Sequence, residues 1–170
     1  MHLSEEEWEQ GAETLGISAI KYFEFNRDRK SQYVFDFDKV LDPRGNTGVY
    51  LIYQYVRICS IFTKAGSSPE QIEAAIADGK VFTVTHPTER NLAITLLKLP
   101  EQVDAASDEL QMLRLTELLY DVSTKIGAFY AACRVVGSEE QESRLILLEA
   151  ARKVMKQIFD LLGMKVLQRI

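Results

Sequence analysis

Cysteine and histidine are scarce in this sequence of 170 residues, which has two of each. Structural zinc sites take four ligands, drawn mainly from these two residue types. His2 and His86 lie far apart in the chain, and no cysteine or carboxylate cluster stands at ligand spacing beside either. The sequence therefore predicts no metal site. Cys59 and Cys133 each fall within a predicted amphipathic helix, so we expect buried, reduced thiols rather than a disulfide.

Long apolar runs and an N-terminal leader are also missing. No apolar stretch approaches the roughly 20 residues that a membrane-spanning helix needs. The chain starts MHLSEEEWEQ, which is acidic where a signal peptide is basic and then apolar. With 46% apolar residues, the composition favours a globular protein with a substantial core. We expect it in the cytoplasm, without attachment to a membrane.

Motifs for binding nucleotides or for catalysis are absent as well. The glycine-rich phosphate loop GxxxxGK[ST] does not occur. Asp36 and Asp38 can face the same way from a strand, as a paired acid and base require, but two solvated acids beside Phe35 and Phe37 are the favoured interpretation. The sequence predicts no catalytic residue and no cofactor in this chain.

Basic residues are fewer than acidic residues, so the net charge is -5. This balance argues against nucleic-acid binding through bulk electrostatics. The distribution is uneven, since residues 141–170 hold six basic and three acidic side chains, whereas residues 101–121 hold one basic and six acidic. We therefore predict a basic side and an acidic side of the molecule.

What the sequence does contain is a succession of helix signals. Serines and prolines stand where helices begin, and glycines stand where they end, with Gly16 ending the first helix and a capping box of Ser138 and Gln141 opening the last. Residues 33–38 alternate like a short extended piece, and Pro100 interrupts or kinks the chain. We predict an all-α helical bundle, with helices at 3–15, 17–25, 48–65, 69–78, 85–99, 101–107, 114–135 and 138–162.

The helix predicted at 48–65 has two different faces. At 100° per residue, one side carries Leu51, Tyr55, Ile58, Cys59 and Phe62. The other side carries Tyr50, Tyr53, Gln54, Arg57 and Lys64. Tyrosines beside an amide and cations can stack on bases and hold phosphates. The same pattern also suits a second packing face in an all-helical core, and either Asn46 or Thr47 can cap this helix.

Several separated runs resemble one known family in their order and spacing. They are ISAIKYFEFNRDR, VFDFDKVL, GNTGVYLIYQYVRICSI, LRLTELLYDVSTKIGAFYAACRVVG and SRLILLEAARKVMKQIFDLLGMKVLQRI. Together they are similar to the end of the catalytic domain and the DALR-type anticodon-binding domain of arginyl-tRNA synthetases, with the best fit to cytosolic eukaryotic enzymes. The resemblance covers nearly the whole chain. It places residues 1–44 at the end of the catalytic domain and its connector, and residues 45–170 in the helical anticodon-binding domain.

This resemblance implies a C-terminal fragment of an arginine–tRNA ligase, an enzyme that activates arginine with ATP and magnesium and transfers it to tRNA. The HIGH and KMSKS signatures that handle ATP in this class have no counterpart here. We therefore expect the fragment alone to be inactive, with ATP bound by the missing catalytic domain. The implied partners are arginine tRNA, the catalytic domain of the same protein and multisynthetase proteins, and we expect the fragment itself to be a monomer.

The same resemblance implies a set of residues that meet the anticodon loop. They are Tyr50, Tyr53, Arg57, Tyr130, Arg134 and Ile170. Two of them have an alternative role, because Arg57 can form a salt bridge to Asp36 or Asp38, and Tyr130 can pack in the core. The chain departs from many relatives by ending in Ile170 rather than methionine, and its ending resembles that of plant-like cytosolic enzymes.

A second class of function fits the same tyrosine face. A helical interaction module could dock another domain or a synthetase partner through it. RNA binding should weaken steeply as salt rises, whereas docking through buried aromatic area should not.

Overall fold

The computed structural model describes residues 4 to 167, and every regular element in that range is a helix. The predicted all-α class is therefore confirmed. The helices are α1 (Glu5–Phe25), α2 (Phe37–Val40), α3 (Gly48–Ala65), α4 (Pro69–Ala77), α5 (Pro87–Leu96), α6 (Leu99–Glu109), α7 (Leu113–Ala132) and α8 (Gln141–Leu161). Within residues 4–167, none of the helices is both long and apolar enough to cross a membrane.

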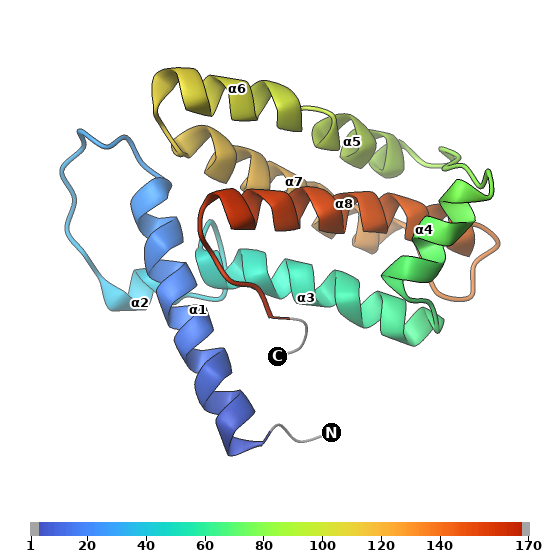
Figure 1. Cartoon of the computed structure of the whole chain (residues 1–170), viewed down its shortest axis with the longest axis horizontal. Coiled ribbons are helices and arrows are strands. Elements are labelled where there is room, and N and C mark those ends of the chain that lie inside the picture. The colour runs from blue at the N-terminus through green and yellow to red at the C-terminus, as the bar shows by residue number, and fades with distance from the viewer. Residues whose placement is uncertain (1–3, 168–170) are drawn as a thin grey trace.

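The centre of the molecule is a bundle of α3, α7 and α8, which contact one another in all three pairings. Helix α5 packs on α7 and α8, and α6 continues along α7, so these two short helices cover the side of the bundle opposite α3 (Figure 1). The main packing partner of helix α4 is α8. Helix α1 crosses the beginning of α3 (Figure 1). The shared core includes Leu51, Ile58, Leu92, Leu119, Ile126, Phe129, Leu148, Met155 and Phe159, all fully buried.

Helix α3 begins and ends where the sequence predicts. Thr47 is its N-cap, because the Thr47 Oγ1 accepts a hydrogen bond from the Tyr50 amide at 3.2 Å. Gly66 ends it in the left-handed region at φ 66°, where glycine carries no steric cost. Asn46 has a different role, since its Oδ1 lies 2.5 Å from the Tyr22 hydroxyl on α1.

Helix α1 is continuous from Glu5 to Phe25, so the predicted break at Gly16 is wrong. A glycine inside a helix costs only about 1 kcal/mol relative to alanine, and burial of the following turns outweighs that cost. Ser18, Ala19 and Tyr22 are all buried against the neighbouring helices. The contact with α3 is close, because a Cβ on Gly48 would lie 2.9 Å from the Ala19 Cα.

Of the segment predicted to be extended at 33–38, only Phe37 and Asp38 are helical, in the single turn of α2. Asp36 is extended and caps α2, accepting hydrogen bonds from the amides of Asp38 and Lys39 at 3.0 and 3.3 Å. The alternation of aromatic and acidic residues that suggested a strand thus reflects an Asp cap followed by one helical turn.

Two other boundaries also differ from the prediction. Pro100 lies in the first turn of α6, where its missing N–H costs nothing, rather than interrupting the chain between the helices predicted at 85–99 and 101–107. The capping box of Ser138 and Gln141 does not form, because α8 starts only at Gln141. The Ser138 hydroxyl donates to the Val135 carbonyl at 3.0 Å, and Gln141 Oε1 accepts from the Gly137 amide at 2.7 Å. Both side chains therefore shape the connection between α7 and α8.

Candidate nucleic-acid interface

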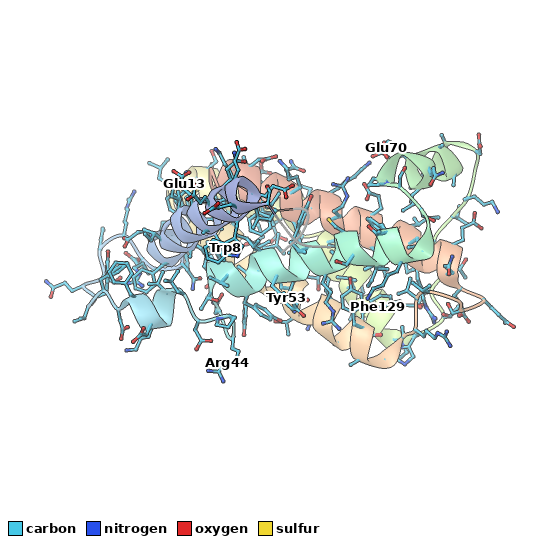
Figure 2. All side chains as sticks on the ribbon, turned by 90° about the horizontal axis from the view of Figure 1, so that it is seen from below. Trp8, Glu13, Arg44, Tyr53, Glu70 and Phe129 are labelled. Carbon is cyan, nitrogen blue, oxygen red and sulfur yellow. The ribbon has the colours of Figure 1, made fainter. Side chains whose placement is uncertain are left out.

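The two faces that the sequence predicts for α3 are present, except at Gln54. Leu51, Tyr55, Ile58 and Phe62 are buried, and Cys59 is partly buried against the core. On the other side, Arg57 and Lys64 are exposed, and Tyr53 projects from α3 with half of its surface accessible, at 50% (Figure 2). Gln54 was wrongly placed on this side, because it is buried and its Oε1 has no hydrogen-bond partner. The physical reason is that α3 contacts α1, α7 and α8, so more than one face is covered.

A cavity of about 290 Å³ opens between α3 and the end of α7. We call it the basic cavity. Its lining consists of Arg57, Ser60, Ile61, Lys64, Tyr130, Cys133, Arg134, Val135 and Val136. Three cationic side chains thus converge here, two from α3 and one from the connection that follows α7. Among the residues that the structure describes, no carboxylate lines this cavity.

Arg57 is held over an aromatic ring. Its Cζ lies 4.5 Å from the centre of the Tyr130 ring, within the range of a cation–π interaction. The alternative salt bridge to Asp36 or Asp38 does not form, and Asp36 instead caps α2 and pairs with Lys39 at 3.6 Å. Because the ring does not neutralise it, the guanidinium keeps its full charge and its hydrogen-bond donors for a ligand.

Tyr130 combines the two roles that the sequence left open. Its ring packs against the core beside Phe129, with ring centres 5.6 Å apart, and also lines the basic cavity. Its hydroxyl is buried without a hydrogen-bond partner, and burial raises the pKa of Tyr130 well above its ordinary value. Tyr130 is therefore an uncharged part of the cavity lining that supports Arg57, rather than a freely exposed ring for stacking.

Arg134 lies just beyond the end of α7. Its Nε donates to the Val136 carbonyl at 2.9 Å, which folds the side chain back along its own connection. Gly137, at φ 75°, leaves room for it, since a Cβ there would lie 3.3 Å from Arg134 Nη2. The guanidinium is nevertheless exposed and takes part in the lining of the basic cavity.

The structure thus brings together three of the six predicted residues, Arg57, Tyr130 and Arg134. Tyr53 and Tyr50 lie one and two turns before Arg57 on α3, outside the basic cavity. Tyr50 is partly buried, and its ring centre lies 6.3 Å from that of Tyr120. Ile170 lies outside the described residues.

Sequence reasoning missed part of the lining of the basic cavity. Ser60 and Ile61 follow Arg57 by three and four residues, so helical spacing alone marks them as neighbours. Val135 and Val136 carry no such signal, because they reach the cavity only through the fold of the connection after α7.

The predicted basic side at 141–170 is largely neutralised. Of its six cations, Arg169 lies outside the described residues and four form ion pairs, namely Arg144 with Glu89 and Glu140, Arg152 with Glu149, Lys153 with Glu73, and Lys156 with Asp160. Some partners are three or four residues away on α8, and others come from α4 and α5. Counting charges along the chain therefore overstated the positive charge that α8 presents, whereas Arg57, Lys64 and Arg134 converge at the basic cavity.

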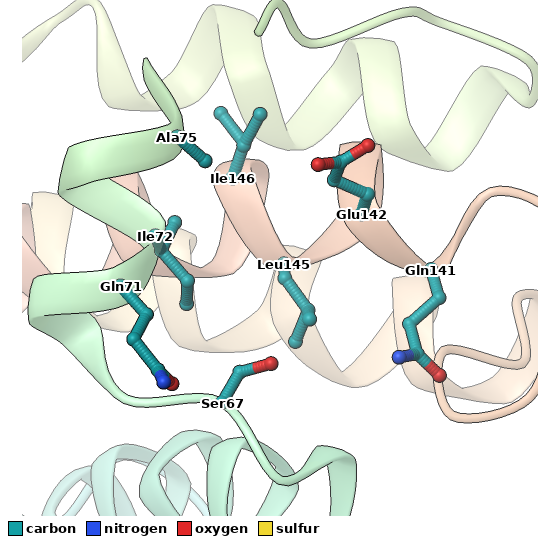
Figure 3. Close-up of a pocket in the computed structure, with 8 residues that line it drawn as sticks. All are labelled: Ser67, Gln71, Ile72, Ala75, Gln141, Glu142, Leu145 and Ile146. Atoms are coloured by element: carbon teal, nitrogen blue, oxygen red, sulfur yellow. The ribbon is translucent and has the colours of Figure 1, made fainter. Parts of the chain in front are cut away.

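A second cavity, of about 260 Å³, lies between α4 and α8 (Figure 3). Ile72 and Ala75 of α4 face Leu145 and Ile146 of α8 across it. Glu142 is the one charged side chain that residues 4–167 contribute to its lining, and it pairs with Lys80 at 3.0 Å. This composition does not suit a polyanion, so the basic cavity is the better candidate for an RNA contact.

Comparison with protein families gives one match, in which residues 51–170 fit the DALR anticodon binding domain. The chain is 40% identical over 165 residues to the chloroplastic/mitochondrial arginine–tRNA ligase of Arabidopsis thaliana, covering 97% of this chain and 25% of that protein. It is also 40% identical over 160 residues to the cytoplasmic arginine–tRNA ligase of the same plant, covering 94% of this chain and 26% of that protein. The chain thus spans about a quarter of the length of these relatives.

A solved structure shows the same fold. The arginyl-tRNA synthetase of Plasmodium falciparum superposes with a TM-score of 0.84 and 37% identity, covering 95% of this chain and 28% of the other. The superposition includes the helices on both sides of the basic cavity, because it spans nearly all of the present chain. These matches fit an anticodon-binding domain and not the alternative of a general interaction module.

Proposed function

The chain belongs to the DALR anticodon-binding domain family, and we propose that it is the region of an arginyl-tRNA synthetase that recognises the anticodon loop of arginine tRNA. The observation that carries this proposal is the basic cavity, where Arg57, Lys64 and Arg134 converge without a carboxylate among the lining residues. A molecule with a net charge of -5 repels RNA at long range. A local group of unpaired cations provides the attraction that the whole protein lacks.

The arrangement suits a single-stranded loop better than a duplex. Loops expose unstacked bases, which proteins bind by stacking on aromatic rings and on guanidinium planes. Tyr53 offers an exposed ring, and Arg57 offers a guanidinium backed by Tyr130. Lys64 and Arg134 line the same cavity and can bind phosphates. We assign stacking to Tyr50 and Tyr53, and phosphate or base-edge contacts to Arg57 and Arg134.

The proposal extends to the parent protein, in which this region would act as part of an arginine–tRNA ligase. The chemistry with ATP and magnesium would take place in a catalytic domain outside residues 1–170, and the present chain alone would be inactive. Residues 1–44 would then be the end of that catalytic domain and its connector, and residues 45–170 the anticodon-binding domain.

An aromatic patch beside α1 supports attachment to another domain. The rings of Phe23, Tyr33, Phe35 and Phe37 form a chain of edge-to-face contacts, with centres 4.8 to 5.5 Å apart. Phe37 remains 64% exposed, and the Arg27 guanidinium lies 3.8 Å from the ring centres of both Phe23 and Tyr33. Contiguous exposed aromatic surface of this kind is typical of an interface.

The remaining predictions concern the origin and setting of the parent. We retain a cytosolic eukaryotic origin, a cytoplasmic location, a monomeric fragment and contact with multisynthetase proteins as proposals. Equal identity to an organellar and a cytoplasmic plant ligase fits either compartment.

The test of the proposed function is a binding titration with arginine tRNA and with a tRNA of a different anticodon. We expect Arg57→Ala to weaken binding of arginine tRNA by roughly tenfold, and to lower the slope of log K against log salt by about 0.7, the value for one phosphate contact on a single strand. Arg90→Ala is the matched control, because Arg90 is an exposed arginine on α5, across the bundle from α3. Equal affinity of the wild type and Arg57→Ala for arginine tRNA would remove the basic cavity as the site.

A further inference from the structure

Arg144 is a buried arginine near the start of α8, with only 10% of its side chain exposed. All of its guanidinium nitrogens have partners. Its Nε donates to Glu89 Oε1 at 2.7 Å, and Nη2 lies 3.5 Å from Thr85 Oγ1. Its Nη1 pairs with Glu140 Oε2 at 3.0 Å. Burying a cation is costly unless it is paired and hydrogen-bonded, and Arg144 meets both conditions.

The partner of Arg144 is itself fixed in place. Glu89 is fully buried at the beginning of α5, and its Oε2 accepts hydrogen bonds from the amides of Thr85 and His86 at 2.7 and 2.9 Å. Burial alone would raise the pKa of Glu89, but the hydrogen bonds from Arg144 and these amides outweigh it and lower the pKa. Glu89 thus stays ionised and acts as a rigid support for the guanidinium.

The same guanidinium also binds the connection between α7 and α8. Its Nη1 donates to the Arg134 carbonyl at 2.7 Å and lies 3.3 Å from the Ser138 Oγ. These two contacts fall at the beginning and near the end of the connection that carries Val135 and Val136. Arg144 does not line the basic cavity, but it fixes the backbone of the residues that do.

We propose that Arg144, supported by Glu89, is a positioning residue for RNA binding, which holds the connection after α7 so that Arg134 meets Arg57 and Lys64 at the basic cavity. This role rests on the proposed function. Arg144 and Glu89 are not among the tyrosines and cations to which we assign direct contacts with RNA. Its basis is the pair of bonds from one buried guanidinium to Glu89 on α5 and to the Arg134 carbonyl.

Lysine cannot replace Arg144 in this arrangement. The planar guanidinium directs donors to a carboxylate, a backbone carbonyl and a hydroxyl at once, whereas an ammonium group is a single compact charge on a flexible stem. Arg144→Lys keeps the net charge of the protein and loses the geometry. Any change in RNA binding therefore reports the placement of the connection rather than the total charge.

The experiment is a double-mutant cycle on the binding of arginine tRNA, with Arg144→Lys, Arg134→Ala and the double variant. We expect Arg144→Lys to weaken binding by roughly tenfold and to lower the salt slope by as much as Arg134→Ala does, although no charge is removed. Once Arg144 is changed, Arg134→Ala should cause little further loss. A role in stability alone would leave the salt slope of Arg144→Lys at the wild-type value and the two effects additive.

Arg152→Lys is the matched control. Arg152 lies on the same helix and pairs with buried Glu149 at 2.7 Å, but its other contact is the Tyr55 hydroxyl at 3.2 Å and not the connection after α7. We expect its affinity and salt slope to match the wild type. Should Arg144→Lys fail to fold, Glu89→Gln replaces it in the cycle, because the amide keeps the shape of the carboxylate while removing the charge that orients Arg144.

The outcomes separate this inference from the proposed function. Loss of binding in Arg57→Ala and Arg134→Ala together with wild-type binding in Arg144→Lys and Glu89→Gln would overturn the positioning role alone. Wild-type binding of arginine tRNA by Arg57→Ala and Arg134→Ala would overturn the proposed function itself.

Discussion

Replacing Gly48 with alanine tests the close contact between α1 and α3. The added Cβ would lie 2.9 Å from the Ala19 Cα, 3.0 Å from the Tyr22 Cβ and 3.2 Å from the Ser18 carbonyl oxygen. Two of these three atoms belong to the backbone of α1, so they cannot move aside as the end of a flexible side chain would. Overpacking of this kind costs about 1–3 kcal/mol. Gly48 is the first residue of α3, where alanine gains little from its higher helix propensity.

Gly127 provides a matched control for the same substitution. It lies inside α7, and nothing comes within 4 Å of a Cβ built on it. Gly127→Ala should therefore stabilise the protein by up to about 1 kcal/mol through helix propensity alone. The same glycine-to-alanine substitution is thus expected to lower the free energy of unfolding at Gly48 and to raise it at Gly127.

Urea denaturation followed by circular dichroism measures both effects as shifts of the midpoint at an unchanged slope. A thermal melt gives a second measure, with a shift of about 2–4 °C for each kcal/mol in a protein of this size. A Gly48→Ala protein as stable as the wild type, beside a stabilised Gly127→Ala protein, would refute the close approach of α1 to α3. Equal destabilisation of both variants would show that the atoms around each glycine do not decide the effect of the added methyl group. That result would also refute the packing argument.

Two further predictions concern stability. Tyr130→Phe removes a buried hydroxyl that has no hydrogen-bond partner, so we expect the urea midpoint to stay unchanged or to rise by the equivalent of about 1 kcal/mol, and a clear loss would show that the hydroxyl is bonded in solution. The lowered pKa of Glu89 means that its carboxylate stabilises the fold above its unfolded pKa of about 4.5, and that this contribution disappears as the pH falls through its lower folded value. Glu89→Gln should therefore have a shallower loss of stability between pH 5 and pH 3, and a wild-type slope in that variant would assign the acid sensitivity to other carboxylates.

The part of the fold that the sequence predicts well is the part governed by helical periodicity. The buried stripe of α7 follows from the spacing of apolar residues, and the bounds of α3 follow from the cap at Thr47 and from Gly66. Local signals failed where tertiary contacts decide the outcome. Gly16 does not end α1, because the turns after it are buried, and Ser138 does not cap α8, because it bonds Val135 and Arg144 instead.

The candidate site shows the same division. Arg57 and Tyr130 were each marked by the sequence, but their stacking joins two residues 73 positions apart on different helices and has no local signal. Charge counting failed at 141–170, since the partners that neutralise Arg144 and Lys153 lie on α5 and α4. Lys64 gained importance only when the structure placed Arg134 beside the same cavity.

Helix α1 has a mechanical consequence for the rest of the molecule. Its inner half is held by Tyr22, which bonds Asn46 and Thr116, and by Ser18 and Lys21, which donate to the carbonyls of Lys165 and Gly163. Its outer half is scarcely supported, and Trp8 is 65% exposed there (Figure 2).

A helix of 21 residues is about 30 Å long, so α1 extends as a stiff arm beyond the contact between Ala19 and Gly48. A force applied to its outer end would act with leverage on the first turn of α3 and on the segment after α8 together. The two ends of the folded chain would then respond as one mechanical unit.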